Sequence, residues 1–144
     1  MPNRRKFDHI ANCKFRVEIE GVTVGAFMEV DGLESITEVE EFADGDDIIL
    51  RKRPGRTSYS NIILKRGFTW PGSELWDWRE KVVEGKIERK AGSIIICGDD
   101  GSEIMRYNFF EAWPCRWRNS MLHGMGNSTM TEEVELVVEK IEMG

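Results

Sequence analysis

The segment RKRPGRTSYSNIILKRG, residues 51–67, decides how the rest of the chain is interpreted. It carries six basic residues, a Pro-Gly pair at positions 54 and 55, and an apolar run at positions 62–64. Directly upstream, residues 38–47 carry six acids and no base. Two adjacent blocks of opposite sign can neutralise each other within one chain or pair between neighbouring copies. We therefore predict a contact surface between subunits here. Its members are Glu38, Glu40, Glu41, Asp44, Asp46, Asp47, Arg51, Lys52, Arg53, Arg56 and Tyr59.

The composition is that of one soluble globular domain. The 144 residues are 40% hydrophobic and 32% charged, and a chain of this length buries roughly two-thirds of its unfolded surface. A formal net charge of −6 argues against general nucleic-acid binding, which depends on contacts to phosphate. Cys13, Cys97 and Cys115 are widely spaced and form no CxxC pair, so we expect reduced thiols and neither disulfides nor zinc. No secretory signal or membrane-spanning run stands out, so we expect cytoplasmic synthesis and assembly without a membrane anchor.

Alternating hydrophobicity predicts strands along most of the chain. Residues 14–20 place Phe15, Val17 and Ile19 on one face, and residues 22–30 follow with a second apolar face, so we expect a β-hairpin. Further strands are predicted at residues 59–66, 93–97, 103–110, 112–117 and 131–143, with an edge or bulge at Pro114. About seven or eight antiparallel strands of this kind curl into a β-barrel or a packed sandwich.

Residues 36–59 do not fit the wall of such a barrel. The segment 36–42 favours β-structure, but its acids and apolar residues fall on both faces. Asp44-Gly45 is a good hairpin turn, residues 48–50 are the expected return strand, and Pro54-Gly55 is expected to end the hairpin. We predict an extended arm at about residues 38–59 whose apolar groups are covered by a partner. The alternative is a mobile surface hairpin.

One helix is predicted at about residues 74–84. Ser73 stands at the position of an N-terminal cap, and Gly85 stands where a glycine commonly ends a helix. Aromatic and aliphatic residues at helical spacing are typical of a helix that is packed over a sheet. The residues assigned to this packing are Leu75, Trp76, Trp78 and Val82.

No catalytic, cofactor or metal site emerges from the motifs. His9 and His123 are the only histidines, and neither belongs to an HExxH pattern. A GxSxG elbow and a GxxxxGK phosphate loop are both missing from the sequence. We expect a protein that is not an enzyme and that uses no cofactor or metal.

Several motifs, in order, resemble a known family. The segments FRVEIEGVTVGAFMEVDGLE and RKRPGRTSYSNIILKRG are followed by a helix from ELWDW to EGK, and then by RKAGSIIICGDDG, FFEAWPCRW and TEEVELVVEKIE. This order resembles the tail-tube proteins of contractile phages and the inner-tube proteins of contractile injection systems. The likeness covers nearly the whole chain from about Phe15, and Cys115 within AWPCRW is a departure from the pattern.

The resemblance implies a structural subunit. Hexameric rings would stack into a hollow tube inside a contractile sheath, strands of adjacent subunits would form the lumen wall, and the arm would reach the neighbouring ring. The implied partners are other copies of the chain, the sheath, the baseplate or spike hub, a terminator, and luminal cargo of protein or DNA. The helix is expected on the outer side, facing the sheath, and the lumen is expected to be polar. A tube initiator beside the baseplate, a type VI secretion tube subunit and, in another class, a small-molecule-binding β-barrel are the alternatives.

Overall fold

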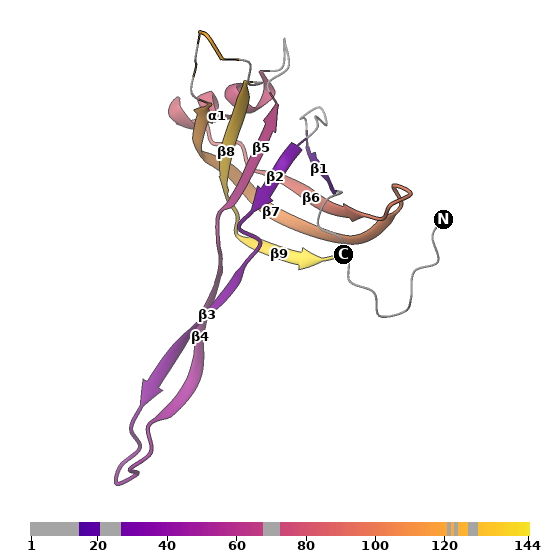
Figure 1. Ribbon diagram of the computed structural model, residues 1–144. Helices are drawn as coiled ribbons and strands as arrows, with labels where there is room; N and C mark the ends of the chain where they lie inside the picture. The colour runs from indigo at the N-terminus through magenta and orange to yellow at the C-terminus, as the bar shows by residue number, and fades with distance from the viewer. Residues whose placement is uncertain (1–14, 21–26, 68–72, 121, 123, 127–129) are drawn as a thin grey trace.

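The computed structural model describes residues 15–20, 27–67, 73–120, 122, 124–126 and 130–144. In this part of the chain, antiparallel strands form a strongly curved sheet with a helix at one end, and a two-stranded hairpin projects far from the body (Figure 1). The predicted mainly β class is therefore confirmed. The elements are β1 (Phe15–Ile19), β2 (Phe27–Asp31), β3 (Ser35–Phe42), β4 (Arg51–Tyr59), β5 (Ile62–Gly67), α1 (Glu74–Val83), β6 (Lys90–Cys97), β7 (Glu103–Asn119), β8 (Thr131–Val137) and β9 (Lys140–Met143).

The long strand β7 turns the sheet into two layers. Its first part pairs with β6 on one side and β9 on the other, and its last part pairs with β8. Between these parts Glu111 has a φ of 55°, and the register with β6 slips between Lys90 and Gly92. Such a bulge bends a strand and lets it pass from one layer to the next. The result is a first layer in the order β1-β6-β7-β9 and a second in the order β7-β8-β5-β2.

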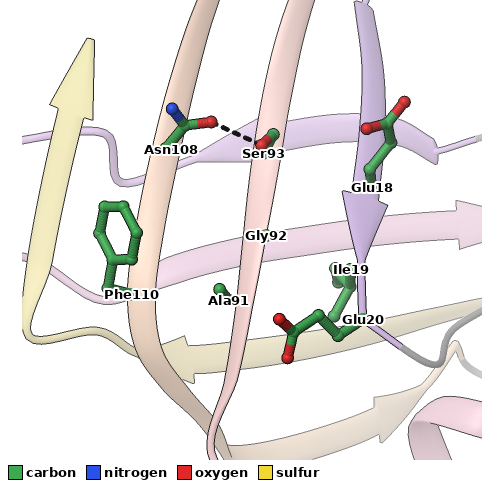
Figure 2. Close-up of a pocket in the computed structure, with 8 residues that line it drawn as sticks. All are labelled: Glu18, Ile19, Glu20, Ala91, Gly92, Ser93, Asn108 and Phe110. Atoms are coloured by element: carbon green, nitrogen blue, oxygen red, sulfur yellow. Dashed lines mark hydrogen bonds between the residues drawn. The ribbon is translucent and has the colours of Figure 1, made fainter. Parts of the chain in front are cut away.

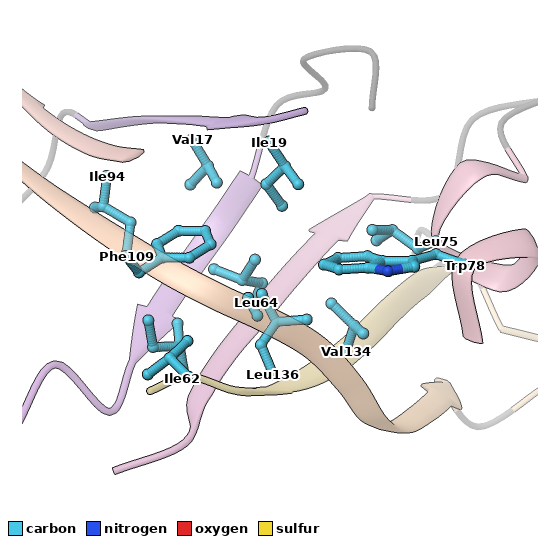
Figure 3. Close-up of a cluster of buried hydrophobic side chains, with 12 residues drawn as sticks. Val17, Ile19, Ile62, Leu64, Leu75, Trp78, Ile94, Phe109, Val134 and Leu136 are labelled. Atoms are coloured by element: carbon cyan, nitrogen blue, oxygen red, sulfur yellow. The ribbon is translucent and has the colours of Figure 1, made fainter. Parts of the chain in front are cut away.

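One apolar core lies between the two layers. Ile94 and Phe109 from the first layer meet Leu64 and Leu136 from the second, and each is at most 2% exposed (Figure 3). A Cβ atom on Gly92 would lie 2.3 Å from Cζ of Phe109, so the glycine leaves the space that the ring fills. This arrangement matches the packed sandwich rather than a closed barrel, because β1 and β2 stand at opposite ends of the described strand order.

The hydrophobic periodicity predicted where the strands lie but not which strands pair with each other. The strand at residues 14–20 is confirmed as β1, with Val17 and Ile19 buried. The hairpin predicted between it and residues 22–30 is wrong, because β1 pairs with β6 and β2 pairs with β5. Residues 21–26, which include the predicted turn, lie outside the described part of the chain. Alternation identifies the buried face of a strand but says nothing about the strand beside it.

Two boundaries also differ from the prediction. The strands expected at residues 103–110 and 112–117 form the single strand β7, and the strand expected at residues 131–143 is split into β8 and β9. The bulge expected at Pro114 is confirmed by a register shift between Pro114 and Arg116. The earlier irregularity at Glu111 changes which residues face the core, so Ala112 and Pro114 are buried while the predicted apolar residue Trp113 is half-buried.

The helix lies as predicted, with one difference at its start. It ends at Val83, and Gly85 follows with a φ of 80°. Ser73 occupies the N-terminal cap position, but its hydroxyl donates to the Asp77 carboxylate at 3.1 Å and accepts no hydrogen bond from the α1 backbone amides. Because Asp77 lies on the first turn, the contact still ties the start of the helix to the preceding chain.

Candidate assembly surfaces

The hairpin β3–β4 forms a free-standing arm. Its strands pair only with each other in the described structure, and all eight residues of β3 are exposed. The arm extends away from both layers (Figure 1). The predicted return strand at residues 48–50 is wrong, since the chain returns along β4. Pro54-Gly55 does not end the arm, because it lies within β4 at a register shift, where the loss of one donor is tolerated.

Some of the opposite charges pair within the arm itself. Glu40 and Arg53 are cross-strand partners, with 2.8 Å between Oε2 and Nε, and Arg51 lies 2.7 Å from Asp47. The Arg53 guanidinium also lies 5.5 Å from the ring centre of Phe42. For these two pairs, the opposite charges therefore neutralise each other within one chain. The Glu40–Arg53 pair is exposed and the Arg51–Asp47 pair is largely so, with Asp47 half-buried, so each contributes about 1 kcal/mol or less to stability.

The other charged residues of the predicted surface remain available. They are exposed, and no ion pair with another described residue forms at any of them. They are Glu38, Glu41, Asp44, Asp46, Lys52 and Arg56. Tyr59 is different, because it lies at the root of the arm and packs against the subunit's own core.

The arm also carries exposed apolar residues, which agrees with the prediction that a partner covers the apolar groups of the arm, although the predicted list of contact residues contains none of them. Ile48 at the tip is 98% exposed, Ile49 59% and Leu50 51%, and Val39 is 65% exposed. Large exposed apolar groups that lie close together indicate a protein–protein contact. The signal was the uninterrupted run Ile-Ile-Leu after the Asp-Gly turn. This run has the composition of a strand, although it lies in the tip loop.

Helix α1 has a buried and an exposed aromatic face. Leu75 and Trp78 are at most 2% exposed, and Nε1 of Trp78 donates to the carbonyl oxygen of Glu88 at 2.7 Å. Trp76 is 43% exposed and meets Trp117 of β7 edge to face, with ring centres 4.7 Å apart. Val82 is half-buried. Of the four predicted packing residues, Leu75 and Trp78 are therefore buried and Val82 is half-buried, whereas Trp76 contributes to the surface as well as to the contact with the sheet.

A buried ion pair joins α1 to both neighbouring strands. Arg66 of β5 and Glu132 of β8 are cross-strand partners with 2.5 Å between Nε and Oε1, and their side chains are 5% and 1% exposed. Arg66 also lies 3.3 Å from Glu74 at the start of α1. The second carboxylate oxygen of Glu132 accepts from Nε1 of Trp117 at 3.0 Å. This network fixes the start of α1 against the sheet.

The face of the first layer that points away from the core is largely polar, although the fully buried Ile95 lies on it between Arg16 and Arg106. It holds a shallow depression of about 430 Å³ between β1, β6 and β7, where Ser93 donates to Asn108 at 2.6 Å and Glu18, Glu20 and Phe110 form the rim (Figure 2). Elsewhere on this face, ion pairs hold the charges in place. The hydrogen bond that Arg106 donates lowers the pKa of Glu103, and the hydrogen bond that Lys140 donates to Glu142 raises the pKa of Lys140. The predicted polar lumen wall has a suitable candidate in this face.

Cysteine and metal chemistry contribute little to these surfaces. Cys97 is buried, and burial, followed by the charge of Glu135, raises the pKa of the half-buried Cys115 thiol. Across the described segments, no group of three or more His, Cys, Asp or Glu side chains is placed to hold a metal ion. Likewise, no helix in these segments is long and apolar enough to span a bilayer.

Comparison with known proteins agrees with this architecture. The family model for T4-like virus tail tube protein gp19 matches residues 11–142. The fold is similar to a chain of the PVC extracellular contractile injection system sheath-tube complex in its extended state, with 25% identity, a TM-score of 0.85, and 94% of this chain and 91% of that chain covered. It is also similar to a chain of the PVC sheath/tube terminator, with 25% identity, a TM-score of 0.87 and coverage of 97% and 99%. Hcp1 from Flavobacterium johnsoniae shares the fold at 20% identity, with a TM-score of 0.60 and coverage of 90% and 94%. None of the curated proteins compared matches the sequence.

Proposed function

The chain belongs to the T4-like virus tail tube protein family, and on that premise we propose that it forms the inner tube of a contractile particle as a stack of hexameric rings. The main support for the proposal is that a single subunit, in its described segments, leaves strand edges and its arm without partners. The core of one subunit is filled, but the outer edges of β1, β2 and β9 and a projecting arm have no partner among the described residues. A family of structural tube proteins also agrees with the expectation of a protein that is not an enzyme.

Rings follow from the edges of the first layer. Its four strands alternate in direction, so β9 runs opposite to β1 at the far edge. Rotation about a tube axis preserves strand direction, and the β9 edge of one copy therefore meets the β1 edge of the next in antiparallel orientation. Each ring closed in this way leaves no free edge in the layer. The polar face of the joined layers would then line the lumen.

Stacking follows from the arm. The arm points away from the end of the body that carries α1 (Figure 1), so identical rings stacked head to tail would bring the tip to the next ring. Burial of Ile48, Ile49 and Leu50 would supply the apolar part of that contact. Lys52 and Arg56 are the basic residues left to meet acids of the neighbouring subunit, while Arg51 and Arg53 would exchange the partners that they already have.

The other partners follow from position on the ring. Sheath subunits would contact the exposed face of α1 around Trp76, and baseplate or spike hub and terminator proteins would cap the two ends of the stack. Two similar chains come from complexes described as sheath-tube and sheath/tube terminator, which supports contacts with sheath and terminator proteins. The cargo passes through the lumen and is protein or DNA. The particle is a phage tail or a phage tail-like device that is assembled in the cytoplasm.

Negative-stain microscopy of the concentrated protein tests the proposal. We expect rings with a central hole and tubes, and R53E/R56E should give folded subunits and rings that no longer stack. The matched control K86E/R89E reverses two exposed basic residues beyond the end of α1 and should still form tubes. Tubes of normal length from R53E/R56E would refute the role of the arm charges. A wild-type protein that stays monomeric at every concentration would refute the function.

The same assay separates two positions in the particle. The similarity to the sheath-tube chain and to the terminator chain is nearly equal, with TM-scores of 0.85 and 0.87. A main tube subunit extends to long tubes when it is alone, whereas a terminal subunit stops at one ring.

A further inference from the structure

The two free edges of the first layer carry complementary side chains. On the polar face, β1 presents Arg16 and Glu18, and β9 presents Lys140 and Glu142. On the core face, β9 ends at Met143, which is 65% exposed although it continues the row of Tyr107. A large apolar side chain that is exposed at a sheet edge is the kind of group that a neighbouring strand covers.

The backbone groups at both edges have a defined direction. The amide of Glu20 donates to Ala91 at 3.2 Å, and that of Gly144 donates to Arg106 at 2.8 Å. In an antiparallel pair, hydrogen-bonding groups alternate between the two sides of a strand. Even-numbered residues of β1 and β9 therefore point their N–H and C=O groups into their own layer. The odd-numbered residues point theirs toward the free edge, which leaves Val17 and Ile141 ready to bond.

These directions allow only some registers between β9 and the next copy's β1. A shift by one residue would turn Ile141 to the polar face and bring together backbone groups that point away from each other. Only registers that set odd residues opposite odd residues remain, such as Ile141 opposite Val17 or Ile19.

Charge selects one of these registers. Continuation of the rows of the layer without a shift would place Glu142 opposite Glu18, a repulsive pair that offsets the attractive pair of Lys140 and Glu20 in the same register. A shift of two residues places Glu142 opposite Arg16 and Lys140 opposite Glu18, so both pairs attract. A further shift of two places Lys140 opposite Arg16, and the opposite shift places Glu142 opposite Glu20, and both of these pairs repel. Closed barrels also require a stagger between strands, which the unshifted register does not supply.

We infer that adjacent subunits join at a seam in which Glu142 of one copy faces Arg16 of the next and Lys140 faces Glu18. The inference rests on the proposed ring and adds the register and the residues that choose the partner edge. In this register Met143 lies opposite Phe15, so its exposed side chain becomes covered. Lys140 and Glu142 pair with each other in the single subunit, but both are about half exposed, so that contact is readily exchanged.

Disulfide cross-linking tests the register directly. In a variant whose native cysteines Cys13, Cys97 and Cys115 are replaced by alanine, K140C/E18C should form a ladder of covalent oligomers on a non-reducing gel. The matched variant K140C/E20C, which reports the unshifted register, should stay monomeric on the gel. Within one subunit β7 and β6 separate the two positions, a distance of about 14 Å at about 4.8 Å per strand. Because disulfides need Cα atoms within about 7 Å, every cross-link must join two copies.

Charge exchange provides the second measurement. E142R should weaken ring formation at least tenfold in concentration, because it sets a second guanidinium group against Arg16, and R16E/E142R should restore it. Without the shift, the basic side chain of E142R would oppose Glu18 and strengthen the ring instead, which would overturn the inference. Efficient cross-linking of K140C/E20C, or rings without any cross-link in either variant, would overturn it while leaving the tube function intact. A wild-type protein without rings would overturn the function and the seam together.

Discussion

Replacement of Glu132 by glutamine should cost much more stability than the same change at Glu40. Both glutamates bond Nε of a cross-strand arginine, at 2.5 Å for Arg66 and 2.8 Å for Arg53. The side chains are 5% and 1% exposed in the first pair, and 66% and 50% exposed in the second. The two variants therefore compare one kind of bond in two environments.

The magnitude follows from the charge that is left behind. Loss of one partner from a buried pair costs about 3–5 kcal/mol, because the other charge stays desolvated. Glu74 remains 3.3 Å from Arg66, so we expect the low end for E132Q, about 3 kcal/mol. The exposed pair should contribute about 1 kcal/mol or less, so E40Q should be nearly neutral. R66M/E132L removes both charges and should recover most of the loss, less about 1 kcal/mol for the acceptor that Trp117 loses.

Urea unfolding followed by circular dichroism measures these differences. The protein concentration should be low enough that sedimentation shows single subunits, since ring formation would add to the apparent stability. With a slope of about 1.5 kcal/mol per M, the midpoint of E132Q should fall by about 2 M. Equal losses in E132Q and E40Q, or a change below about 1 kcal/mol in E132Q, would refute the assignment of this buried pair.

Two further predictions concern the packing of the first layer and the thiol of β7. G92A should lower stability by about 1–3 kcal/mol in thermal unfolding, because the new Cβ would lie 2.3 Å from Phe109, whereas G124A, with nothing within 4 Å, should be neutral. If neither G92A nor G124A changed the stability, the core around Phe109 would be able to rearrange and accept the added methyl group. Cys115 should react with iodoacetamide more slowly than a free thiol near pH 8, since burial and the Glu135 charge raise its pKa, and E135Q should speed the reaction. No change in E135Q would contradict the contribution of that carboxylate.

Local patterns predicted the elements that depend on neighbours in the sequence. The helix at Glu74–Val83 follows from its apolar spacing and from Gly85, and the face of β1 follows from alternation. Local patterns do not predict which strands pair. Phe15 pairs with Ile96, for example, and no residue in either strand identifies the other as its partner. The arm was detected from its lack of one apolar face, but its return strand was misplaced. The β-favouring run Ile48–Leu50 resembles a strand, whereas the tip loop leaves it exposed to a partner.

The buried ion pair left a signal that the sequence prediction did not use. Arg66 follows Leu64 by two residues, so it shares the buried face of β5, and Glu132 precedes Val134 by two residues on β8. A charged residue that falls in phase with buried positions on a strand indicates a pair inside the fold. The neighbouring positive charges of the basic segment 51–67 instead favour the interpretation of Arg66 as one of several surface charges.

The chain thus separates the charges that hold the subunit from those that join subunits. Arg66 and Glu132 satisfy each other inside one copy, while Arg16 and Glu142 lie at two free edges that meet only in a ring. If this division is correct, E132Q should lower the urea midpoint of the single subunit and leave the concentration of ring formation unchanged wherever the protein is folded. R16E should do the opposite and lower ring formation with an unchanged midpoint. A variant of either kind that moves both quantities together would show that folding and assembly share the same contacts.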